Sequence, residues 1–146
     1  MPGELNMIKL CVGAEGVEDL ELWQTRRVAE ARAAGRDATP SHVTRMWPKR
    51  EAELTSGGAL YWVFKGLVLA RQRIASLTPR DGADGIRRCV IGFEPEIVRT
   101  VPQPRRPFQG WRYLRTVDAP RDLIGEETAS DLPPDLMAEL AAIGVL

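Results

Sequence analysis

The chain has 146 residues and a mass of 16.2 kDa, with 44% hydrophobic and 27% charged side chains, which is enough for one domain with its own core. Twenty basic residues balance twenty acidic ones, so the net charge of zero does not by itself point to an oppositely charged partner. With no apolar run near the roughly 20 residues of a membrane span and no signal-peptide pattern, we expect a cytoplasmic protein without membrane contact.

The first half of the chain predicts one strand followed by two helices. Residues 6–12 are short and apolar and end at a glycine, which is typical of a buried strand. Over 17–34, apolar residues recur at helical spacing, acidic residues lie near the start and a glycine follows the end, so we expect an amphipathic helix. A loop at 39–41 precedes a short second helix over 48–54, with Pro48 in its first turn.

The second half predicts mainly strands. Residues that favour β-structure fill 59–65 and 67–74, and Gly66 between them indicates a bulge or a barrel corner. Three further strands are expected at 88–93, 97–101 and 110–115, separated by loops at 78–85 and 102–109 that are rich in turn residues and prolines. Because strands and helices do not alternate, the order predicts an α+β fold, a small bent antiparallel sheet or a β-barrel with flanking helices.

Charge and aromatic rings are unevenly distributed along the chain. Residues 40–121 carry fifteen basic and seven acidic side chains and eight of the nine aromatic rings, whereas 122–146 carry six acidic side chains and no basic one. We expect residues 1–124 to form a single α+β domain. An acidic linker and a helix near 133–143 should follow it, so that residues 125–146 pack on that domain. An electrostatic function would belong to residues 40–121.

Few residues are available for metal or nucleophilic chemistry. His42 is the single histidine, and Cys11 and Cys89 lie far apart, so we expect no metal, no cofactor and no disulfide. The two cysteines are interpreted as small apolar residues in buried strands. His42 is placed in a surface turn, where a structural role is favoured over a catalytic one.

Arginine accounts for seventeen of the twenty basic residues, and its guanidinium group both binds phosphates and stacks on flat rings. Arg71 and Arg73 alternate along one expected strand and should face the same way. A basic surface that carries aromatic rings is typical of single-stranded nucleic-acid binding, because rings stack on bases while cations hold the backbone. We therefore predict a non-catalytic nucleic-acid-binding module, with RNA favoured over duplex DNA. The predicted contacts to phosphate are Arg45, Lys49, Arg50, Lys65, Arg71, Arg73, Arg105, Arg106 and Arg112, and the predicted stacking rings are Trp47, Phe108, Trp111 and Tyr113.

Other interpretations stay open at this point. The protein could be an enzyme that acts on a nucleotide or another small anion, with His42 as the acid or base. It could also be a protein-interaction module that uses the acidic tail. A purely structural interpretation places the aromatic rings in the core and pairs the arginines with the acidic termini, and we do assign Trp62, Phe64 and Phe93 to the core. The oligomeric state is not predicted.

Four segments carry a resemblance to a known family, namely 8–13 (IKLCVG), 42–50 (HVTRMWPKR), 58–66 (GALYWVFKG) together with 71–74, and 105–114 (RRPFQGWRYL). Up to about Leu123, the chain resembles an alphaproteobacterial family catalogued as a domain of unknown function (family 1489), with the tail outside the resemblance. The family brings no established activity and hence no catalytic residue. At the level of fold, the bent strand, the helix and the length resemble the PUA-like group, which implies a β-barrel and includes domains that bind RNA or modified bases.

Overall fold

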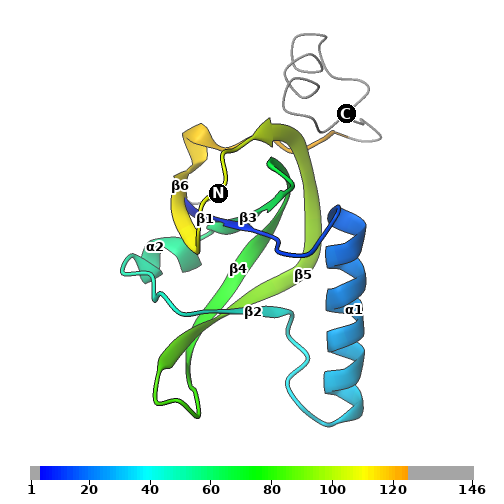
Figure 1. The fold of residues 1–146 in the computed structure, drawn as a ribbon, viewed down its shortest axis with the longest axis vertical. Coiled ribbons are helices and arrows are strands. Elements are labelled where there is room, and N and C mark those ends of the chain that lie inside the picture. Colours follow the sequence, from blue (N-terminus) through cyan, green and yellow to red (C-terminus); the bar gives the residue numbers. More distant parts are fainter. Residues whose placement is uncertain (1–3, 125–146) are drawn as a thin grey trace.

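The computed structural model describes residues 4–124 (Figure 1). Its elements are β1 (Leu5–Leu10), α1 (Val17–Ala33), β2 (Ser41–Thr44), α2 (Glu51–Thr55), β3 (Ala59–Phe64), β4 (Leu67–Asp81), β5 (Arg87–Pro104) and β6 (Trp111–Arg115), followed by a 3₁₀ turn at Thr116–Asp118. This content confirms the predicted α+β class. The expected linker and helix of 125–146 lie outside the described residues.

All six strands form one sheet in the order β2-β5-β4-β3-β1-β6. Every neighbouring pair is antiparallel except β1 and β3, which run parallel, so the prediction of a wholly antiparallel sheet is wrong. The parallel pair requires a long crossover, and the chain makes it through α1, β2 and α2. Within residues 4–124, β2 and β6 remain as two edges, so the sheet is open and the PUA-like barrel stays a prediction.

β4 and β5 are the longest strands of the sheet, and together they form a strongly bent two-stranded ribbon (Figure 1). Its ladder changes register at three places along β4, which marks bulges that bend a strand. As a result the two halves of β5 have different outer neighbours. The first half pairs with β2, whereas the second half is joined by residues 121–123, where Leu123 N donates to Arg99 O at 3.0 Å.

Two predicted boundaries are wrong because of this long ribbon. β4 continues as strand into residues 78–81, which were expected to be a loop, since the first half of β5 pairs with it there. β5 is one strand rather than the two predicted, and it continues to Pro104 into the expected proline loop. Pro95 fits inside it because the ladder shifts register between Phe93 and Ile97, where no regular N–H donor is needed.

Gly66 has a different role from the predicted bulge. Lys65 and Gly66 form the two-residue turn between β3 and β4, with φ angles of 48° and 86°. Positive φ at both central positions is the pattern of a type I′ hairpin turn, which matches the right-handed twist of the strands. The turn therefore joins two separate strands and projects Lys65 from the end of the hairpin.

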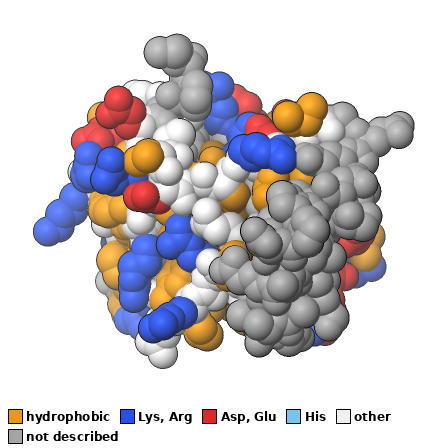
Figure 2. Space-filling view, turned by 90° about the horizontal axis from the view of Figure 1, so that it is seen from above, with side chains coloured by type: hydrophobic (Ala, Val, Ile, Leu, Met, Phe, Trp, Pro, Cys, Tyr) orange, Lys and Arg blue, Asp and Glu red, His pale blue; other side chains and the backbone are white. Residues whose placement is uncertain are grey.

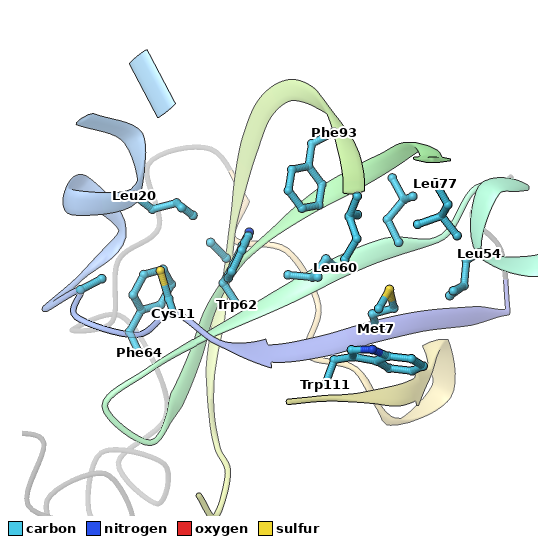
Figure 3. Close-up of a cluster of buried hydrophobic side chains, with 14 of the residues drawn as sticks. Met7, Cys11, Leu20, Leu54, Leu60, Trp62, Phe64, Leu77, Phe93 and Trp111 are labelled. Carbon is cyan, nitrogen blue, oxygen red and sulfur yellow. The ribbon is translucent and has the colours of Figure 1, made fainter. Parts of the chain in front are cut away.

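The core lies on both faces of the sheet. β3 is at its centre and is buried at all six positions, as expected for a strand that is covered on both sides. The larger cluster includes the predicted core residues Trp62, Phe64 and Phe93, and α1 and α2 pack against it through Leu20 and Leu54 (Figure 3). A smaller cluster, with Tyr61 and Val63 from the alternate positions of β3, covers the other face.

Candidate functional site

The structure divides the predicted phosphate-binding residues into two sets. Four have carboxylate partners, in the pairs Arg50–Glu53, Lys65–Glu15, Arg71–Asp122 and Arg73–Glu94. The Arg71 pair has two parallel bonds, Nε to Oδ1 at 2.8 Å and Nη2 to Oδ2 at 2.7 Å, which raise the pKa of Arg71. A phosphate that approached Arg71 would have to displace a well-placed carboxylate.

The second set has no such partner. Within residues 4–124, no carboxylate lies within ion-pair distance of Arg45, Lys49, Arg105, Arg106 or Arg112. Among the described residues, Arg105 and Arg112 donate hydrogen bonds only to neutral groups, for example Arg112 Nη1 to Gln109 O at 2.9 Å. Arg115, which is not among the predicted phosphate contacts, also has no carboxylate partner in the described part of the chain.

Two surface clefts meet at Arg105. The first has a volume of about 930 Å³ and lies between the turn after β1, the β3–β4 turn and the loop after β5, with Lys65, Arg105 and Arg106 in its wall. The second, of about 560 Å³, lies beside β6, and its lining includes Arg50, Arg105, Arg115, Tyr113 and Asp118. Figure 2 looks onto this end of the molecule and shows Lys and Arg side chains gathered between apolar patches. We call the lining of these two clefts the Arg105 surface.

Two of the predicted stacking rings are not on this surface. Trp111 is only 4% exposed, and its indole Nε1 donates to Met46 O at 2.9 Å, which makes it a core residue. Its ring is therefore unavailable to a base in this conformation. Trp47 is partly buried against the larger cluster, and its indole donates to Glu51 at 3.3 Å.

The other two rings lie beside arginines. Tyr113 is 37% exposed, its hydroxyl accepts the backbone N–H of Arg50 at 3.1 Å, and the Arg50 guanidinium lies 5.8 Å from the ring centroid. Phe108 is partly buried on the loop before β6, with the Arg112 guanidinium 5.4 Å from its ring centroid. Each of these rings already makes the cation–π contact that arginine and aromatic residues favour.

His42 is not in a surface turn, as the sequence suggested, but on the edge strand β2, paired with Ile91 of β5. Its ring meets the indole of Trp62 edge to face, with centroids 5.5 Å apart. Burial, followed by the positive charges of Lys9 and Arg27, lowers the pKa of His42 to about 4. The imidazole is thus neutral at pH 7, far from the pKa that suits a general acid or base near neutrality.

A small pocket of about 120 Å³ opens beside His42, between the end of β1, β2 and α1. Lys9, Arg27, His42 and Trp62 are among its lining residues. Two nitrogen atoms of these side chains, His42 Nε2 and Trp62 Nε1, are buried and have no hydrogen-bond partner in the described part of the chain. We call this cavity the His42 pocket.

The cysteines are poorly placed for nucleophilic chemistry. Cys11 and Cys89 are free and buried, and burial raises the pKa of each thiol to about 11. Both are therefore protonated at neutral pH, where the thiolate is the reactive form. In residues 4–124, no group of three or more His, Cys, Asp or Glu side chains is arranged to hold a metal ion, and no helix is long and apolar enough to cross a membrane.

A family model described as "Protein of unknown function (DUF1489)" matches residues 7–146. The chain belongs to this family. Because the match extends to residue 146, the prediction that the tail lies outside the family is wrong. Searches of curated proteins and of solved structures found no match. The family description assigns no activity, so the function has to be argued from the site.

Proposed function

We propose that this protein is a non-catalytic module that binds single-stranded nucleic acid, with RNA favoured, on the Arg105 surface. The observation that carries the proposal is the convergence of Arg50, Arg105, Arg106 and Arg115 on two adjoining clefts beside the exposed ring of Tyr113. Cations that hold a backbone and rings that stack on bases are the two components of sequence-tolerant binding to single strands.

Five basic side chains and two acidic ones, Glu15 and Asp118, line the two clefts, and this excess of positive charge favours a phosphate ligand. Arg105, Arg106 and Arg115 have no carboxylate partner among the described residues, so a phosphate can bind them without displacing an acidic group. Arg50 contributes less, because its guanidinium is already bonded to Glu53. Asp118 also lines the second cleft, where its backbone carbonyl accepts from Arg105 Nη2 at 3.4 Å.

Apolar groups around these arginines favour a single strand over a duplex. Tyr113 presents its ring to solvent in the second cleft, and the first cleft includes Leu10 and Pro107 in its wall. A base can reach such groups only when it is unstacked, as in single-stranded loops and ends.

The proposed site differs in membership from the one predicted from the sequence. Arg71 and Arg73 are left out because each has a carboxylate partner, and Trp111 is left out because it is in the core. Arg115 is added. The enzyme alternative is weakened because the pKa of His42, lowered to about 4, is poorly matched to acid–base chemistry near neutral pH.

The test compares two pairs of charge substitutions in the full chain. Arg105→Gln/Arg115→Gln removes two cations from the proposed site. The matched control, Arg36→Gln/Arg80→Gln, removes two exposed arginines near the end of α1 and the β4–β5 hairpin, at the opposite end of the molecule (Figure 1). Fluorescence anisotropy with a labelled RNA of about ten nucleotides gives the affinity at several salt concentrations.

Each phosphate contact to a single strand contributes about −0.7 to the slope of log affinity against log salt. We therefore expect the site pair to make the slope shallower by up to about 1.4, while the control pair leaves it unchanged. If both pairs change the slope equally, or neither does, binding is not centred on Arg105.

The variant Tyr113→Leu separates the contribution of ring stacking to RNA affinity from the contribution of charge. Removing a stacked ring weakens binding by about 1–3 kcal/mol without altering the number of phosphate contacts. The affinity should fall while the salt slope stays the same. Circular dichroism of the variant controls for folding, and unchanged affinity in a folded variant would remove Tyr113 from the site.

A further inference from the structure

The His42 pocket contains polar groups that the fold leaves unsatisfied. Trp62 is 3% exposed, and among residues 4–124 neither its Nε1 nor Nε2 of His42 has a hydrogen-bond partner. Buried polar atoms of this kind are rare in folded proteins, and each points to a missing partner such as water or a ligand. Here both atoms belong to side chains that line the same cavity.

The pocket is also positively charged. Lys9 and Arg27 line it, no carboxylate lies within ion-pair distance of either within residues 4–124, and no described lining residue is acidic. The pKa of Lys9 is lowered, chiefly by burial. A half-buried ammonium group without a counterion is unfavourable, because buried charges in proteins are normally paired.

The remaining wall is apolar and the space is small. Leu20 and Trp23 of α1 face the pocket, whose volume is about 120 Å³. For comparison, an apolar cavity of about 150 Å³ in a protein accommodates benzene. The pocket is smaller than that cavity, so one six-membered ring is the upper limit for the apolar body of a molecule that it can hold.

We propose that the His42 pocket binds a small organic carboxylate with such an apolar body. The carboxylate accepts hydrogen bonds from the indole of Trp62 and the imidazole of His42, and Lys9 and Arg27 supply the compensating charge. In one of its neutral tautomers the imidazole donates from Nε2. The pocket shares the β1–α1 turn with the first cleft but no charged side chain, so this inference is independent of nucleic-acid binding.

A nucleobase fits these groups less well than a carboxylate does. A base presents donors as well as acceptors and needs both in return. The amide of Gln24, which lines the pocket, already makes two bonds with the amide of Gln72, at 2.8 and 2.7 Å. The other polar groups of the described lining are mostly donors, which match the oxygens of an anion.

The test is an NMR titration of the ¹⁵N-labelled full chain, in which the indole N–H signals report ligand binding. The binding measurement itself uses the natural sequence. The Trp62 signal is assigned by its loss in Trp62→Phe. Benzoate is the probe, and benzyl alcohol, uridine and inorganic phosphate are the comparison ligands. We expect benzoate to shift the Trp62 signal saturably and benzyl alcohol to bind about tenfold or more weakly, because it has no charge.

Charge-removing substitutions then test which basic residues bind the carboxylate. Arg27→Gln and Lys9→Gln should each weaken benzoate binding by about tenfold, whereas Arg26→Gln, an exposed neighbour on α1, should leave it unchanged. The proposal is overturned if benzoate leaves the Trp62 signal unmoved. It is also overturned if phosphate binds as well as benzoate, which would indicate a general anion site, or if uridine alone binds, which would indicate a base pocket.

Discussion

Acidification should destabilise this protein through His42. The pKa of His42 is lowered from its ordinary value of 6.5 to about 4 by burial and by the charges of Lys9 and Arg27. Between these two values the unfolded chain binds a proton at His42 that the folded chain does not. The free energy of unfolding should therefore fall as the pH drops from 6.5, and the loss should be complete near pH 4.

The magnitude follows from the size of the shift. One unit of pKa difference corresponds to about 1.4 kcal/mol, so a shift from 6.5 to about 4 gives a loss of about 3 kcal/mol as an upper value. Solvent reaches part of the ring, which reduces the effect to about 2–3 kcal/mol. A small domain has about 5–15 kcal/mol of stability in total, so the change is large enough to measure.

Denaturant unfolding across this pH range measures the effect, with His42→Asn as the control. The asparagine variant cannot gain a proton there, so its stability should change less with pH than that of the natural chain. Buffers without carboxylate should be used, because an acid bound in the His42 pocket would alter the titration. The pKa values of Asp37 and Asp84 are lowered by hydrogen bonds to Thr39 and Arg88, so their protonation affects the free energy of unfolding at lower pH than His42 does. Equal loss of stability in both proteins between pH 6.5 and 4 would refute the assignment to His42.

Three further predictions concern the fold. Gln72→Leu leaves the buried amide of Gln24 unpartnered and should lower the free energy of unfolding by about 1–3 kcal/mol, whereas Gln24→Leu/Gln72→Leu should recover the part of that loss that comes from Gln24, because the bond from Gln72 to Glu94 O is absent in both variants. Denaturant unfolding of both proteins checks this, and a double variant less stable than the single one would contradict it. Asp122→Asn removes the carboxylate from Arg71 and should speed hydrogen exchange at the Leu123 amide, with unchanged exchange as the contrary result. A chelator or a reductant should leave the thermal unfolding temperature unchanged, and a loss of several kcal/mol with either would reveal a structural metal or disulfide.

Elements with a strong local pattern could be predicted from the sequence. The helix expected over 17–34 is observed as Val17–Ala33, and the apolar run at 59–65 is the central strand β3. β2 could not be predicted in this way, because its four residues become a strand only by pairing with β5, far along the chain. That omission is the reason why His42 was placed on the surface.

The composition of the site was predictable and its geometry was not. A surplus of arginine and aromatic residues in 40–121 predicts the part of the chain that supplies the proposed site. Contacts between distant positions decide which arginines are paired with a carboxylate. Arg71 and Asp122, for example, are 51 residues apart. Strand alternation also could not decide whether Trp111 or Tyr113 is exposed, because both lie on the same face of β6, and only packing against Met46 buries the tryptophan.

The central claim is that the Arg105 surface binds single-stranded nucleic acid. The most direct test is the affinity of the natural chain for a labelled single-stranded RNA, measured from low to moderate salt. We expect saturable binding that weakens as salt rises, with a slope of about −2 if Arg105, Arg106 and Arg115 each contact one phosphate. No measurable binding of RNA or single-stranded DNA at low salt, by protein whose folding is verified, would contradict the claim.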